Sequence, residues 1–157
     1  MTAFVHTHFP NPMNENSYPF ALSHHEFRYE FVSTSQEKEV RKVVLITQTE
    51  NPGIFNLALL DLLENGMLSD LSQPDNKDFR KALATVYRIM LDFTNKNRGA
   101  ILAFQGSDLR RHRLYQIVLN RELFNLSQSW RVYGGINKKV YLFEPDIDYT
   151  IFFMQRQ

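Results

Sequence analysis

Two helix-forming segments on either side of one short apolar strand most strongly constrain the fold of this 157-residue chain. The first begins near Asp75 or Asn76 and ends at Gly99, and its apolar residues recur every three or four positions, as on one face of a helix. These residues are Phe79, Ala82, Leu83, Val86, Met90 and Phe93. The run AILAF at 100–104 follows, bounded by glycines, which is typical of a central strand covered on both faces. A helix–strand–helix unit is therefore expected in the middle of the chain.

The second helical segment is DLRRHRLYQIVLNREL, which follows Ser107. A serine at this position can accept a hydrogen bond from the first free amides of a helix, so we expect Ser107 to cap it. Helical spacing predicts one stripe on this helix, formed by Leu114, Ile117, Val118 and Arg121.

Alternating or β-branched runs on both sides of this unit predict strands. Three precede it at about 26–33, 41–49 and 54–63, and a hairpin with a tight turn at Asn137 follows at 130–145. The predicted order is β-β-β-α-β-α-β-β, and a last short strand is expected at 148–155. The predicted fold class is α+β, with a mixed, mostly antiparallel sheet and two flanking helices.

The first 25 residues differ in character from the rest. Pro10, Pro12 and Pro19 lie among asparagines and scattered aromatic residues, a composition that favours irregular structure. We therefore divide the chain into an irregular N-terminal arm at 1–25 and a single α+β domain at 26–157. A domain of this length can bury a continuous core without disulfides or metal ions.

Composition excludes several classes of function. Eighteen Lys and Arg residues nearly balance seventeen Asp and Glu residues, so no overall positive field directs the chain to nucleic acid or an anionic membrane. The absence of cysteine excludes disulfides, thiol nucleophiles and thiolate metal sites. No stretch has the length and hydrophobicity of a signal peptide core or a membrane span, so we expect a soluble cytoplasmic protein.

Several phrases of the sequence resemble a family of small bacterial proteins that is known only as a domain of unknown function. The phrases are YEFVST, RKVVLI, IFNLALLDLLENGMLSD, KALATVYRIMLDF and AFQGSDLRRHRLYQIVLNR, and they span about residues 26–143. The resemblance implies the extent of the domain and a bacterial origin. It implies no activity.

The predicted order of elements also resembles the later part of the GNAT acetyltransferase superfamily. That resemblance implies coenzyme A bound at the start of the first helix, here at 73–79, where Lys77 and Arg80 are the candidate ligands of the pyrophosphate. The segment lacks the glycine of the superfamily loop and carries Asp75 and Asp78, which suit helix capping better than binding of an anion. The resemblance also implies Tyr115 as a donor of a proton to the departing thiolate, and the alternative role for Tyr115 is an aromatic residue at the edge of the core.

Residues at the start of the second helix suggest a site for an anion. Arg110, Arg111 and Arg113 follow Ser107 closely, and arginine forks bind phosphate and carboxylate groups well. The helix dipole disfavours cations at this end, so a bound anion would explain their presence. The alternative is a solvated face, because side chains at 110, 111 and 113 point in different directions at ~100° per residue.

A nucleic-acid interface is a further alternative, carried by basic and aromatic residues of the final hairpin beside the arginines. The hairpin residues are Arg131, Tyr133, Lys138, Lys139 and Tyr141. We regard binding of nucleic acid as disfavoured, because the net charge is close to zero.

The remaining predictions concern metals, cofactors, dimerisation and the general class of function. Histidines occur at 6, 8, 24 and 25 in patterns that do not favour a designed metal site, so we predict neither a metal nor a cofactor. The apolar segment Ile151 to Met154 offers a strand edge through which a homodimer could form, and the alternative is a strand that completes the sheet of the monomer. The sequence thus favours a non-catalytic binding or interaction module, with a divergent acyl-CoA-dependent N-acyltransferase as the alternative.

Overall fold

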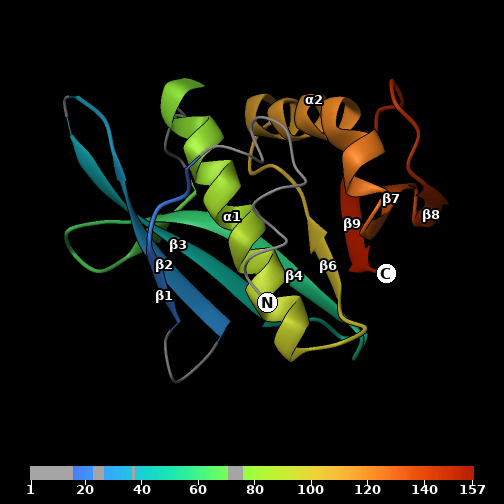
Figure 1. Cartoon of the computed structure of the whole chain (residues 1–157), viewed down its shortest axis with the longest axis horizontal. Helices are drawn as coiled ribbons and strands as arrows, with labels where there is room; N and C mark the ends of the chain where they lie inside the picture. Colours follow the sequence, from blue (N-terminus) through green and yellow to red (C-terminus); the bar gives the residue numbers. More distant parts are fainter. Residues whose placement is uncertain (1–15, 23–26, 37, 71–75) are drawn as a thin grey trace.

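The computed structural model describes residues 16–22, 27–36, 38–70 and 76–157 of the chain. Two helices and a nine-stranded sheet form this part of the molecule (Figure 1). The helices are α1 (Asn76–Lys96) and α2 (Leu109–Leu126). The strands are β1 (Phe20–Leu22), β2 (Phe27–Thr34), β3 (Glu39–Gln48), β4 (Ile54–Leu62), β5 (Leu68–Ser69), β6 (Ile101–Phe104), β7 (Trp130–Ile136), β8 (Lys139–Leu142) and β9 (Ile151–Arg156).

The strands lie in the order β1-β2-β3-β4-β6-β9-β7-β8, and β5 pairs with the end of β4. All neighbours are antiparallel except β4 and β6, which are parallel. The mixed, mostly antiparallel sheet confirms the predicted α+β class, and β6 has the predicted central place. The predicted strands over 26–33, 41–49 and 54–63 are confirmed with small shifts at their ends.

Two short strands were missed by the sequence prediction. β1 lies inside the segment predicted to be irregular, and it pairs Phe20 with Phe31. Just before it, the main-chain amide of Tyr18 donates to the Thr85 hydroxyl of α1, at 2.8 Å. Because β1 has only three residues and β5 only two, neither can show the alternation by which strands are recognised. Tertiary contacts therefore determine both.

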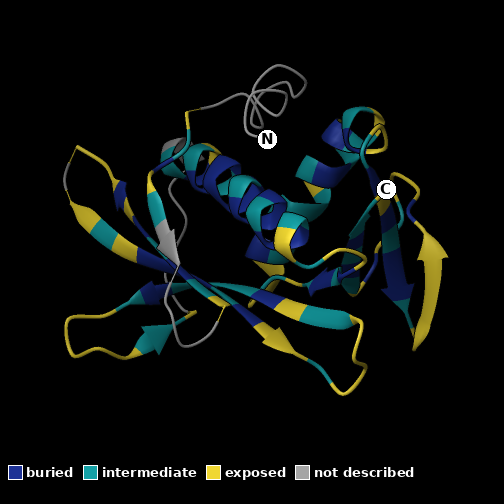
Figure 2. Cartoon of the chain, turned by 60° about the horizontal axis from the view of Figure 1, so that its bottom comes forward, coloured by how far each residue is buried: buried dark blue, intermediate teal, exposed yellow. Residues whose placement is uncertain are grey.

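Both helices pack on the same face of the sheet (Figure 2). The Phe93 ring of α1 lies edge-on to Phe27 and Phe55, with centroid distances of 4.9 and 5.1 Å. On the other half of the sheet, the His112 ring of α2 stacks on Phe152 at 4.8 Å. The core is therefore a single layer of side chains between the sheet and the two helices.

The structure corrects two predictions for α2. Asp108, and not Ser107, is the N-cap, because its carboxylate accepts a hydrogen bond from the Arg111 amide at 2.7 Å. The buried face consists of Arg111, Leu119, Glu122 and Leu126, whereas Ile117 of the predicted stripe is exposed. Apolar residues occur on several sides of this helix, so the spacing alone selected a stripe rotated by roughly one residue, or ~100°. Two charged residues occupy the true buried face.

The C-terminal strand lies inside the sheet. β9 pairs with β6 on one side and with β7 on the other, and Phe152 and Met154 are buried. Its two edges are therefore already paired, and the homodimer contact predicted through a free edge of this strand is not available there. The apolar character of 151–154 reflects burial in the monomer.

Candidate functional site

The candidate site lies where β4 and β6 stop pairing with each other. β4 and β6 are paired at only three positions, which join Ile54 to Ile101, Phe55 to Leu102 and Asn56 to Ala103. Beyond them, residues 57–60 of β4 have no strand partner on that side among the described residues. A cavity of about 360 Å³ occupies the gap between these strands and beneath the two helices.

Most of the cavity wall is apolar. β4 contributes Leu57 and Leu59, and Phe104 ends β6 at the opposite side. The remaining apolar lining comes from α1 with Leu83, Val86 and Met90, from α2 with Val118, Leu119 and Leu126, and from Met154 of β9. Burial of an apolar group in such a cavity is favourable by about 25 cal/mol per Å².

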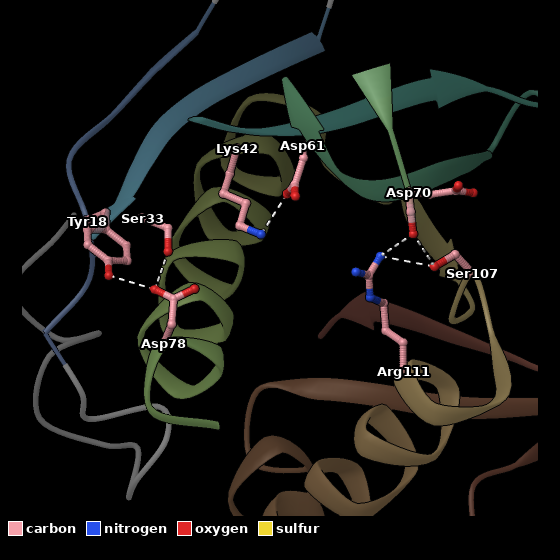
Figure 3. A network of polar contacts seen from close by, with 8 residues as sticks. All are labelled: Tyr18, Ser33, Lys42, Asp61, Asp70, Asp78, Ser107 and Arg111. Carbon is pink, nitrogen blue, oxygen red and sulfur yellow. Dashed lines mark hydrogen bonds and ion pairs between the residues drawn. The ribbon is translucent and has the colours of Figure 1, made fainter. Parts of the chain in front are cut away.

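One end of the cavity is polar. The Arg111 side chain is buried, and its Nη1 donates to the Asp70 carbonyl oxygen at 3.2 Å and to Ser107 Oγ at 3.0 Å. The Ser107 hydroxyl in turn donates to the same carbonyl at 3.0 Å (Figure 3). These bonds tie the first turn of α2 and the loop before it to the chain just after β5. They fix a positive charge at the wall of a mainly apolar cavity, whose other polar lining residues include Asn56, Asp70 and Gln105.

Tyr115 lies one helical turn further along α2 and also lines the cavity. Its ring stacks on Phe79 at 6.2 Å and meets Phe104 edge-on at 6.0 Å. Burial raises the pKa of Tyr115 to about 12, with a smaller opposing effect from the Arg111 charge. The phenol therefore stays protonated at physiological pH, where it can donate a hydrogen bond or a proton but cannot act as a base.

His112 holds the loop between β6 and α2 in place. Its Nδ1 accepts a hydrogen bond from the Gly106 amide at 3.1 Å, and its Nε2 lies 2.7 Å from the carbonyl oxygen of Tyr149. An amide can only donate and a carbonyl can only accept, so this arrangement assigns the hydrogen to Nε2 of a neutral ring. His112 thus positions the segment that carries Ser107 and Arg111.

The structure separates the predicted site residues. Arg111 and Ser107 meet at the cavity, whereas the Arg110 and Arg113 side chains are exposed to solvent. Arg80 is exposed on α1, and the side chain of Lys77 and the loop 71–75 lie outside the described residues. The three arginines therefore do not form one anion-binding site, and only Arg111 faces the cavity.

Histidines 6, 8, 24 and 25 lie outside the described residues. Within the described ranges, no group of three or more His, Asp or Glu side chains could hold a metal ion. No helix of the described part is long and apolar enough to cross a membrane.

Sequence reasoning missed the cavity itself, although one signal for it was present. β4 is nine residues long, whereas β6 has only four, so the two can pair over only part of the length of β4. It also missed the role of His112, which it grouped with the neighbouring arginines. The contacts of this histidine with Gly106 and Tyr149 join residues far apart in sequence and leave no local pattern.

Comparison with known proteins defines a family and no activity. The chain belongs to a family of unknown function, DUF6934, whose match covers residues 14–157. The match is longer than the predicted resemblance over 26–143, and it takes in β1 and the C-terminal strand β9. No curated protein and no solved structure matches the chain.

Proposed function

We propose that this protein is a binding module on a GNAT-like fold, and that its ligand is a small molecule held between β4 and β6. The observation that carries this proposal is the end of the parallel pairing at Asn56 and Ala103, beside a cavity of about 360 Å³. Sites for small molecules are typically mainly apolar, with few polar groups and volumes of roughly 300–1,000 Å³. The parallel strand β6 between two helices supports the resemblance to the acetyltransferase superfamily.

The lining indicates the chemistry of the ligand. An apolar body fits the leucine, valine and methionine side chains, and a carboxylate or phosphate group fits the end at Arg111. A guanidinium in a site of low polarity interacts strongly with an anion, because little water screens the charges. A molecule with an apolar chain and one anionic head is therefore the class of ligand that the cleft suits best.

A thermal-shift titration with decanoate and decan-1-ol tests the proposal, because the two probes share an apolar chain and differ in the charged head. We expect decanoate to raise the Tm in a saturable manner, since binding to the native state alone stabilises it, and decan-1-ol to raise it less. Arg111→Met should remove most of the difference between the probes. Arg113→Met removes an exposed arginine of the same helix and should preserve it.

Three outcomes would contradict the proposal. One is no saturable shift with either probe. Another is equal shifts with both probes that Arg111→Met leaves unchanged. The third is a loss of the decanoate shift in Arg113→Met as large as in Arg111→Met, which would assign the effect to the surface of α2.

A divergent acyl-CoA-dependent N-acyltransferase is the second candidate, favoured by Tyr115. This side chain lines the cavity with its pKa raised to about 12, so it could protonate a departing thiolate. The acyl group would occupy the apolar cleft, and Lys77 and Arg80 at the start of α1 would be the candidate partners of the coenzyme phosphates. The sequence at 70–79 contains no glycine for the coenzyme-binding loop of the superfamily, which makes this candidate secondary.

Acetyl-CoA separates the two candidates. An acyltransferase should show a Tm increase with acetyl-CoA that Lys77→Ala or Arg80→Ala reduces, and it should release free thiol when amines are added. Tyr115→Phe should then slow thiol release by about 10²–10⁴-fold, the usual contribution of a general acid. A binding module should show neither release of thiol nor an effect of Tyr115→Phe on it.

A further inference from the structure

β8 forms one edge of the nine-stranded sheet (Figure 1) and is exposed along its whole length (Figure 2). It pairs with β7 on one side, and no strand of the described chain pairs with its other side. Val140, Tyr141 and Leu142 are 57%, 48% and 69% exposed, although valine, tyrosine and leucine are usually buried in sheets. An exposed apolar edge of this kind is a template for pairing with a further strand.

The hairpin geometry determines which main-chain groups of β8 face outward. Asn137 and Lys138 form a two-residue turn with positive φ angles of 51° and 67°, which makes Ile136 and Lys139 the first hydrogen-bonded pair. Hydrogen-bonded and non-hydrogen-bonded pairs alternate along an antiparallel ladder. Lys139 and Tyr141 therefore direct their main-chain groups to β7, as Phe143 does through its bond to Val132 at 2.9 Å. The amides and carbonyls of Val140 and Leu142 point away from the sheet.

The sequence around Tyr141 is complementary to itself when it is read in opposite directions. Lys138 lies three positions before Tyr141, and Glu144 lies three positions after it. Between them, Val140 and Leu142 are apolar neighbours of Tyr141 on either side. An antiparallel copy centred on Tyr141 would therefore bring Lys138 to Glu144 at each end and Val140 to Leu142 on the same face, while on the other face Tyr141 meets its own copy and Lys139 lies opposite Phe143.

We propose that two copies of this chain form a dimer through their β8 strands, paired antiparallel about a two-fold axis at Tyr141. Val140 of each copy pairs with Leu142 of the other through the main-chain groups that face outward. Lys138 of each copy comes level with Glu144 of the other, and both side chains are exposed in the monomer. The two sheets then form one continuous sheet, and the contact is the same on both copies, as a two-fold axis requires.

Charge selects this register among those that the hydrogen-bond pattern allows. A two-fold axis at Val140 would place Lys138 beside Leu142, and an axis at Leu142 would place Glu144 beside Val140. On the face of Val140 and Leu142, only the axis at Tyr141 pairs apolar residues with apolar residues and opposite charges with each other, and on the other face it places Lys139 opposite Phe143. Val140 and Leu142 also share the sheet face of Tyr133, with which Leu142 is directly paired, so the dimer extends an apolar strip across the junction.

A cysteine substitution tests the register, because the natural chain contains no cysteine. Residues facing each other in a non-hydrogen-bonded pair have Cα atoms about 4.5 Å apart, within the range of about 4.4–6.8 Å that a disulfide spans. Tyr141→Cys should therefore form a disulfide-linked dimer under mild oxidation. Val140→Cys is the matched control, since its two copies would lie about 8 Å apart and could not be bridged.

Charge exchange with analytical ultracentrifugation tests the same contact without oxidation. Lys138→Glu or Glu144→Lys alone should weaken the dimer by about two- to thirty-fold, because each change places like charges together at two symmetric positions. The double variant should restore the dimer. Leu142→Lys should abolish it, and because Leu142 is exposed in the monomer the variant should keep the monomer fold.

Three results would overturn the proposal. The first is a chain that remains monomeric at millimolar concentration. The second is a dimer in which Val140→Cys is linked as rapidly as Tyr141→Cys, which would exclude the axis at Tyr141. The third is a double charge variant that is no tighter than either single variant.

Discussion

Lys42 and Asp61 form an ion pair within the layer between the sheet and α1. Lys42 Nζ lies 2.6 Å from Asp61 Oδ1, and the two residues are directly opposite on β3 and β4. Both are buried, with 9% and 6% of their surface exposed. Figure 3 shows the pair beside a second polar group, in which the Tyr18 and Ser33 hydroxyls donate to the Asp78 carboxylate. Each charge of the pair is therefore tolerated only because the other is present.

We expect Lys42→Met to destabilise the protein by about 3–5 kcal/mol, because it leaves a buried carboxylate without its partner. The double change Lys42→Met with Asp61→Leu should recover most of that loss, since apolar residues of similar volume often replace a buried pair at little cost. Urea unfolding of the single and double variants measures both effects. A double variant that is less stable than the single variant would show that the pair makes a net contribution beyond mutual neutralisation.

Glu122 is a buried acid of a different kind. It is 1% exposed on the inner face of α2, and among the described residues no group meets the geometry of a hydrogen bond to either carboxylate oxygen, although the Asn125 side chain lies nearby. Burial raises its pKa, while Arg121 and Asn125 lower it to a smaller extent. A raised pKa in the folded state means that ionisation costs stability. The cost is absent below the ordinary carboxyl pKa of 4.5 and increases as the pH rises through the folded-state pKa.

Glu122→Gln removes the charge and keeps the shape, so its effect should depend on pH. We expect the variant to gain at least ~1 kcal/mol relative to the natural protein on going from pH 4 to pH 8, because only the natural protein must bury a charge at the higher pH. In a Tm measurement this corresponds to about 2–4 °C. The exposed Glu64→Gln is the control and should show no such trend. A gain that is the same at both pH values would mean that folding does not raise the pKa of Glu122.

The loop between β6 and α2 is the element that delivers Arg111 and Ser107 to the cleft. A Cβ atom at Gly106 would lie 2.1 Å from the main-chain nitrogen of His112, a contact that no side-chain adjustment relieves. We expect Gly106→Ala to destabilise the protein by about 1–3 kcal/mol, as overpacking of a close contact does. Gly53→Ala is the control, because its Cβ would meet only Asn51 Oδ1 at 3.9 Å. Equal stability of the two variants in chemical unfolding would show that the loop can move away from α2.

The elements that the sequence predicted well are those whose burial follows a regular period. α1 is buried on most of its sides, but its large apolar residues Phe79, Val86 and Phe93 still recur at helical spacing and locate the helix. β2 alternates because one of its faces is inside the core and the other is not. In α2 the period fails, because Arg111 and Glu122 are buried while Phe124 is 78% exposed. A pattern based on hydrophobicity cannot find a buried face that is partly charged.

The candidate site was predictable only in part for a related reason. Ser107 and Arg111 were identified from local sequence and Tyr115 from the resemblance to the acetyltransferase superfamily, and the three lie together at the cavity. Their partners do not come from local sequence, because the Asp70 carbonyl and the unpaired stretch of β4 reach the site through strand pairing. The point at which β4 and β6 separate depends on how far β6 extends, and tertiary packing determines the length of β6.

The whole sheet depends on its last strand. β9 lies between β6 and β7, so it joins the half of the molecule that contains α1 to the half that ends in β8. Phe152 is fully buried at this junction and contacts the rings of Phe104, His112 and Phe143. We therefore expect the two halves to unfold together, in one cooperative transition.

Phe152→Ala tests this dependence, because Trp130 is the single tryptophan and reports on β7, whereas far-UV circular dichroism reports on both helices. Removing the ring should destabilise the protein by about 3–5 kcal/mol, since it leaves a cavity at the centre of the sheet. The fluorescence and dichroism transitions should shift together and remain coincident. Phe153→Ala, on the opposite face of the same strand and only half-buried, should cost less. If the fluorescence transition of Phe152→Ala did not coincide with its dichroism transition, then β9 would pair with β7 without coupling the unfolding of β7 to that of the rest of the sheet.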